Sequence, residues 1–196
     1  MTFIETIPED AGAGPAAGLY ATEEEAFGFV PNFVRAFSLR PEVYTAWKGL
    51  NGAVKGGMDL RRYELATLAA ATRLRSSYCT LAHGSVLMDR FLEPETVMAA
   101  VIDHQSAGLD ETDVAVMDLA AKVATDATSV NQADVDRLRS CGLSDQDILD
   151  VVLAAAARCF FSKVLDAVCA EPDGRYAQLD PALRDTLTVG RAIATA

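Results

Sequence analysis

Residues 60–91 read LRRYELATLAAATRLRSSYCTLAHGSVLMDRF, and this stretch decides the fold because it encodes two consecutive helices. Asp59 is a candidate N-cap for the first helix, whose apolar residues follow a helical stripe to about residue 75. Ser76 and Ser77 are candidate N-caps for the second helix, which runs to about Phe91. The chain is therefore expected to turn between two paired helices near Ser76.

Helix signals recur along the rest of the chain, whereas strand signals do not. Thr22 with Glu25 reads as a capping box that opens a short helix ending before Pro31, and Pro41 suits the first position of the next helix. The sequence predicts an all-α protein of roughly eight helices, with one domain over residues 1–196 and a short N-terminal extension over about 1–20. The further helices are expected at about 94–104, 110–125, 131–141, 144–170 and 181–194, with a loop over 172–176.

Composition limits the class of partner. The net charge of −11 argues against a protein that binds nucleic acid or an anionic membrane through a basic face. The chain opens without a secretory leader and contains no apolar run long enough to cross a bilayer, so we expect a soluble cytoplasmic protein. The four cysteines are irregularly spaced, which argues against a secreted disulfide scaffold and against a zinc site. Cys159 and Cys169 are expected to be small core residues.

Cys79 and His83 form a candidate reactive pair, since residues four apart share one face of a helix. Cys79 would lie in the first helical turn, where unpaired N–H groups and the helix dipole favour a thiolate. In one continuous helix Glu64 would lie about 22 Å from Cys79, too far to take part in the same chemistry. If the chain reverses near residue 76, Glu64 and His83 lie on adjacent helices at positions that differ by only about 6 Å along the helix axes. The alternative is that Cys79 is only a buried thiol and His83 only an interface residue.

The same residues resemble a known family. Glu64, Ser76, Cys79 and His83 align without a gap on the pattern of the alkylhydroperoxidase D-like (AhpD-like), carboxymuconolactone decarboxylase superfamily: Glu, Cys-x-x-Cys twelve residues on, then x-x-x-His. Tyr78 suits the peroxidase-related branch of that superfamily, and residues 30–47 and 114–152 resemble its flanking helices. The departure is Ser76, which occupies the position of the first cysteine.

The resemblance implies an AhpD-like helical fold and a thiol-dependent peroxidase-like, antioxidant enzyme with peroxiredoxin activity. Cys79 would be the nucleophile, His83 its base, directly or through water, and Glu64 the group that orients His83, with Ser76 and Tyr78 in support. The substrate would be a small hydroperoxide. Because Ser76 cannot form a disulfide, turnover would need an external thiol, another cysteine brought close by folding, or a redox partner protein. No cofactor or metal is expected.

The resemblance also implies a homo-oligomer, either a dimer, a trimer or a hexamer. Two further functions stay open at this point. One is an acid–base lactone decarboxylase-like enzyme, which needs no cysteine. The other is a non-enzymatic helical oligomer that senses redox state or binds a partner when Cys79 is oxidised.

Overall fold

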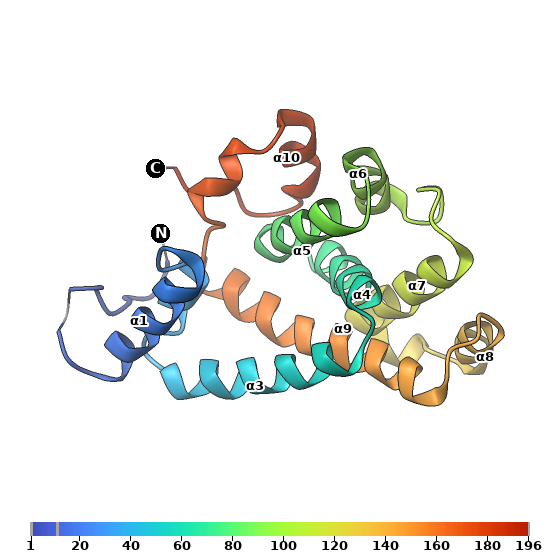
Figure 1. The fold of residues 1–196 in the computed structure, drawn as a ribbon, viewed down its shortest axis with the longest axis horizontal. Helices are drawn as coiled ribbons and strands as arrows, with labels where there is room; N and C mark the ends of the chain where they lie inside the picture. Colours follow the sequence, from blue (N-terminus) through green and yellow to red (C-terminus); the bar gives the residue numbers. More distant parts are fainter. Residues whose placement is uncertain (1, 11, 196) are drawn as a thin grey trace.

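The computed structural model describes residues 2–10 and 12–195, which fold into ten α-helices and two short 3-10 helices without a strand (Figure 1). The predicted all-α class is confirmed. The elements are α1 (Pro15–Phe27), α2 (Asn32–Ala36), α3 (Pro41–Gly57), α4 (Leu60–Arg73), α5 (Ser77–Arg90), α6 (Pro94–Asp103), α7 (Glu111–Asp126), η1 (Ala127–Ser129), α8 (Gln132–Ser140), α9 (Asp145–Ala167), η2 (Gly174–Gln178) and α10 (Pro181–Leu187).

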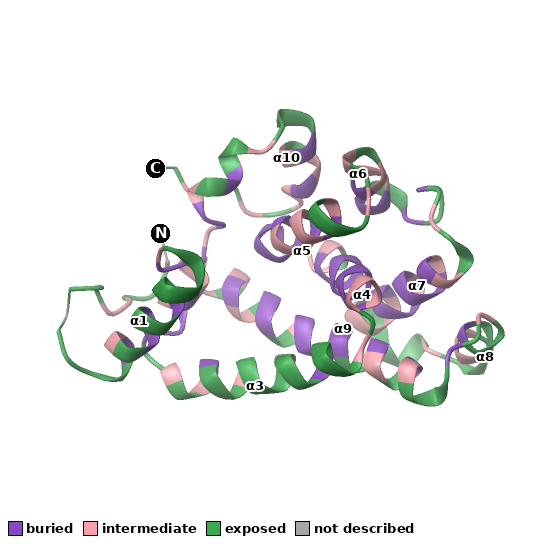
Figure 2. Cartoon of the chain, viewed as in Figure 1, coloured by how far each residue is buried: buried purple, intermediate pink, exposed green. Residues whose placement is uncertain are grey.

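Helix α4 lies at the centre of the molecule and packs against α5, α7 and α9. Every residue from 63 to 71 is buried, so neighbours cover this helix on all sides. Figure 2 shows the contrast with α3, which lies along α9 and is largely exposed. Because the buried residues of α4 lie on all of its faces and not on one stripe, its sequence suits a helix at the centre of the fold.

The predicted turn between α4 and α5 is confirmed. Asp59 caps α4 by accepting a hydrogen bond from the backbone N–H of Arg62 at 3.0 Å. Arg75 adopts a left-handed backbone conformation with φ of 57°, which ends α4 and reverses the chain. Ser76 is the N-cap residue of α5, but its side chain accepts no backbone hydrogen bond. Its buried hydroxyl has no hydrogen-bond partner among the described residues.

The expected start of the first helix at Thr22 is wrong, because α1 begins at Pro15. Proline suits the first turn of a helix, and the Thr22 hydroxyl donates to the Gly18 carbonyl at 2.9 Å as a residue within the helix does. Leu19 and Tyr20 are buried, so the end of the N-terminal segment packs onto the domain. The short helix α2 and the 3-10 helix η2, which lies in the expected loop over 172–176, were not predicted.

The expected terminal helix over 181–194 is too long, because α10 ends at Leu187. The segment beyond it packs against the turn between α4 and α5, and the Gly190 N–H donates to Ser77 Oγ at 2.8 Å. A Cβ at Gly190 would lie 1.9 Å from the Arg75 carbonyl oxygen, so only glycine fits this contact. A tertiary contact therefore decides where α10 ends. Within the described residues, no helix is long and apolar enough to span a bilayer.

Candidate active site

Cys79 is the third residue of α5 and is 1% exposed. A position in the first turn leaves its backbone N–H without an acceptor inside the helix, as expected from the sequence. Two side chains from α9 donate hydrogen bonds to its sulfur: Ser162 Oγ at 3.2 Å and Arg158 Nη1 at 3.5 Å. Donors on this side of the sulfur stabilise a thiolate more than a thiol.

Arg158 is buried, being 3% exposed, and no carboxylate among the described residues lies within ion-pair distance of it. Its Nη2 donates to the Tyr63 hydroxyl at 3.4 Å, and its Nε has no partner. Burial opposes the charge, but the Cys79 sulfur and the Tyr63 hydroxyl hold the pKa of Arg158 above its usual value. The guanidinium is therefore a permanent positive charge whose side-chain hydrogen-bond partners are the Tyr63 hydroxyl and the Cys79 sulfur.

Glu64 and His83 form a second polar pair beside the cysteine. His83 Nδ1 lies 2.5 Å from Glu64 Oε2, which confirms the proximity expected from the sequence. Burial raises the pKa of Glu64, but the hydrogen bond to His83 and the charge of Lys55, whose Nζ lies 3.0 Å away, outweigh it and hold the pKa low. Burial and the charge of Arg158 lower the pKa of His83.

Glu64 is consequently a carboxylate near neutral pH and His83 a neutral imidazole. In that state the Nδ1–H of His83 donates to Glu64, which leaves Nε2 as the acceptor. His83 is not among the hydrogen-bond partners of the Cys79 sulfur, although both residues line the same cavity. A proton passing between them has to cross part of that cavity, through water or a bound ligand.

Tyr78, the second supporting residue, ties α5 to the C-terminal segment. Its hydroxyl donates to Asp173 Oδ2 and accepts from the Phe33 backbone N–H at 3.3 Å. Burial and the neighbouring Asp173 carboxylate raise the pKa of Tyr78 far above its usual value, so its hydroxyl stays protonated. Its ring forms part of the cavity wall.

The cavity has a volume of about 380 Å³ and lies between α1, α2, α3, α4, α5, α9 and η2. Aromatic side chains form much of its wall. Trp47 stacks on Phe161 with ring centroids 3.9 Å apart, and Phe33 meets both Tyr78 and Phe161 edge to face. A mostly apolar cavity with a few convergent polar groups is the usual form of a small-molecule site.

The other cysteines lie outside this cavity. Cys159 and Cys169 were expected to be core residues, but both are half-buried and Cys79 is the more buried thiol. For Cys159 the reason is the orientation of α9, which turns Arg158 inward and Cys159 outward. Since Cys141, Cys159 and Cys169 do not line the cavity, no second cysteine is positioned there to capture an oxidised Cys79.

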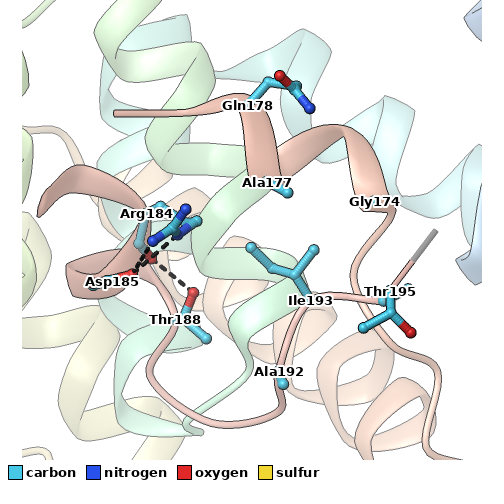
Figure 3. A pocket seen from close by; sticks show the side chains of 10 residues that line it. Gly174, Ala177, Gln178, Arg184, Asp185, Thr188, Ala192, Ile193 and Thr195 are labelled. Carbon is cyan, nitrogen blue, oxygen red and sulfur yellow. Dashed lines mark hydrogen bonds and ion pairs between the residues drawn. The ribbon is translucent and has the colours of Figure 1, made fainter. Parts of the chain in front are cut away.

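A second cavity of about 460 Å³ lies between η2, α10 and the segment after it (Figure 3). Arg184 and Asp185 form an ion pair on its wall, and Ile193 faces it. Its described lining contains neither cysteine nor histidine, so we place the site in the smaller cavity. Across residues 2–10 and 12–195, no group of three or more His, Cys, Asp or Glu side chains is arranged to hold a metal ion.

Sequence reasoning missed the contribution of α9. Five positions of this helix follow one buried stripe at alternating spacings of four and three: Val151, Ala155, Arg158, Ser162 and Leu165. An arginine and a serine on such a stripe are the signal that was available, because charged residues are seldom buried without a specific partner. The partner itself was not visible, since Cys79 lies in a different helix.

Known structures share this fold. The chain is similar to an AhpD-core, uncharacterized peroxidase-related protein from Ralstonia eutropha JMP134, at 21% identity over 97% of this chain and 98% of that chain, with a TM-score of 0.78. A peroxidase-related protein from Silicibacter sp. TM1040 matches at 22% identity over 90% and 94%, with a TM-score of 0.80. The debrominase Bmp8 in complex with 2,3,4-tribromopyrrole matches at 17% identity over 93% and 94%, with a TM-score of 0.70. The class of fold is therefore AhpD-like.

The sequence profile of the carboxymuconolactone decarboxylase family matches residues 41–107, the segment that contains α3 to α6. This segment contributes Glu64, Cys79 and His83 to the site. The resemblance inferred from the residue pattern is thereby confirmed. No curated protein matches the chain in sequence.

Proposed function

We propose that this protein is a thiol-dependent, peroxidase-like enzyme in which Cys79 is the only catalytic cysteine. The observation that carries the proposal is the arrangement around one sulfur. Arg158 and Ser162 donate to it, and His83, which is paired with Glu64, lines the cavity beside it. A buried cation and a base are what a nucleophilic thiol needs.

In the first step the Cys79 thiolate attacks one oxygen of a hydroperoxide. The S–O bond forms and the O–O bond breaks, so the sulfur is oxidised to a sulfenic acid and an alkoxide leaves. His83, which took the thiol proton through Nε2, returns it to the leaving alkoxide and releases an alcohol. Arg158 stabilises the negative charge on sulfur before attack.

Reduction then needs two external thiols. The first forms a mixed disulfide with Cys79 and releases water, and the second restores the Cys79 thiol and leaves as a disulfide. An external reductant is required because Ser76 stands at the position of the first cysteine and the other cysteines lie outside the cavity. The net reaction converts one hydroperoxide and two thiols into an alcohol, water and a disulfide.

A second candidate is thiol-dependent removal of a halogen from an aromatic ring. The aromatic wall of the cavity and the single cysteine in it favour this reading, and the similarity to a debrominase supports it. One aryl halide and two thiols would give the arene, a disulfide and a hydrogen halide. Halide release separates the two functions.

The test is dithiol-dependent consumption of cumene hydroperoxide by the wild-type protein and by the Cys79→Ser, His83→Ala and Glu64→Gln variants. We expect Cys79→Ser to abolish consumption, His83→Ala to slow it by about a hundredfold and Glu64→Gln by less, since general acid–base catalysis contributes about 10²–10⁴-fold. A protein that consumes no hydroperoxide, yet changes its association when Cys79 is oxidised, would be a sensor instead of an enzyme.

A further inference from the structure

The wall of the Cys79 cavity favours a flat ligand. Trp47 and Phe161 lie nearly parallel, with an interplanar angle of 13°, while Phe33 presents an edge to Phe161. These ring faces and edges are fixed by their mutual contacts. Aromatic side chains in such arrangements pack well against another planar ring, by stacking or edge to face.

The positively charged side chains on the cavity wall differ in the group that each one pairs with. Lys48 and Lys55 each pair with a carboxylate, at 2.5 Å and 3.0 Å, and Arg158 faces the sulfur of Cys79. Arg175 is exposed and has no ion-pair partner among residues 2–10 and 12–195. Arg175 is thus the cation on the wall that is left for an anionic ligand, in a protein whose net charge is −11.

Arg175 is also held in place. Its Nη2 donates to the Tyr176 hydroxyl at 3.1 Å, and its guanidinium lies 5.3 Å from the ring centroid of Phe29 and 4.9 Å from that of Tyr176. A guanidinium oriented on aromatic faces still offers a planar set of donors that matches a carboxylate.

We propose that the cavity binds a flat aromatic acid, with its ring against Trp47 and Phe33 and its carboxylate at Arg175. Under the proposed function, which this inference deepens, the hydroperoxide group of such an acid reaches Cys79. The binding of the ring and the carboxylate requires no chemistry at sulfur.

Trp47 is the single tryptophan of the chain, so its fluorescence reports on the cavity directly. The reduced wild-type protein is titrated with benzoate, with benzamide as the uncharged ligand of the same shape, and with cyclohexanecarboxylate as the acid that is not flat. We expect benzoate to bind about tenfold more tightly than benzamide, because only benzoate carries a charge for Arg175. Benzoate should also bind more tightly than cyclohexanecarboxylate, because only its planar ring stacks on the aromatic wall.

Arg175→Gln should remove the preference for benzoate over benzamide and leave the affinity for benzamide unchanged. Arg73→Gln, which changes an exposed arginine outside the cavity, should keep the preference. Equal affinities for benzoate and benzamide, no binding of either, or a preference that survives Arg175→Gln overturns the inference. None of these outcomes depends on hydroperoxide turnover, so a failure of the proposed function remains distinguishable.

Discussion

Cys79 and Cys159 both lie next to Arg158, one across a helix interface and the other along the chain, and their surroundings differ. The guanidinium points to Cys79, which is buried beside a cavity and also accepts a hydrogen bond from Ser162. Cys159 is half-buried on the opposite side of α9, where burial raises the pKa of its thiol more than Lys163 and Arg158 lower it. The more accessible thiol therefore has the less favourable environment for a thiolate. Exposure alone is a poor guide to the reactive cysteine.

Arg158→Met is the substitution expected to reduce most the difference in reactivity between Cys79 and Cys159. It removes the charge at the Cys79 sulfur, and we expect sulfenic acid formation there to slow by about tenfold to a hundredfold, since hydrogen bonds to charged groups contribute about 1.5–3 kcal/mol. Arg158→Lys is the matched control and should retain much of the rate. Because a buried charge without a carboxylate is costly, Arg158→Met should not lower the unfolding temperature. A wild-type rate in Arg158→Met would mean that the guanidinium does not activate the thiol.

Ser76→Cys would increase the difference between Cys79 and Cys159 by placing a second thiol beside Cys79 alone. Position 76 lies one helical turn from Cys79, at the spacing of the two-cysteine pattern that the sequence resembles. We expect an intramolecular 76–79 disulfide after one equivalent of hydroperoxide, and turnover with a dithiol that is several-fold faster. The native hydroxyl caps no backbone N–H, so the substitution loses no cap. A folded variant that forms no disulfide would show that the site has diverged from peroxidase geometry.

A smaller effect is expected on the pH dependence of the free energy of unfolding, to which His83, beside Cys79, contributes. The pKa of His83 is lowered by burial and by Arg158, so the imidazole stays neutral in the folded protein while an unfolded histidine takes up a proton below about pH 6.5. The unfolded state then binds more protons, and the free energy of unfolding should fall as the pH drops below that value. His83→Gln should flatten this slope. Denaturant unfolding at constant ionic strength measures it, and an unchanged slope in His83→Gln would contradict the assignment.

The half of the site that lies on α4 and α5 could be predicted because its signals are local. Asp59, the turn after α4 and the spacing of Glu64, Cys79 and His83 all lie within a short stretch of chain, where helix geometry converts spacing into position. The other half could not be predicted. Arg158 and Ser162 lie 79 and 83 residues from Cys79, so their contacts depend on how α9 packs.

The same limit applies to the ends of the fold. The sequence predicted most central helices closely, because caps and glycines mark their ends. The start of α1 and the end of α10 were wrong. For α10, the contact of Gly190 with Ser77 and Arg75 determines the end, and these residues are more than a hundred positions apart. Long-range packing overrides local helix signals there.

The most direct test of the account is to locate the first oxidised cysteine. The reduced protein is treated with one equivalent of cumene hydroperoxide in the presence of dimedone, which traps sulfenic acids, and the adduct is mapped by mass spectrometry. We expect an adduct on Cys79, the most buried of the four thiols, while Cys159 remains unmodified. An adduct on Cys159, Cys141 or Cys169 with Cys79 still reduced would contradict the account.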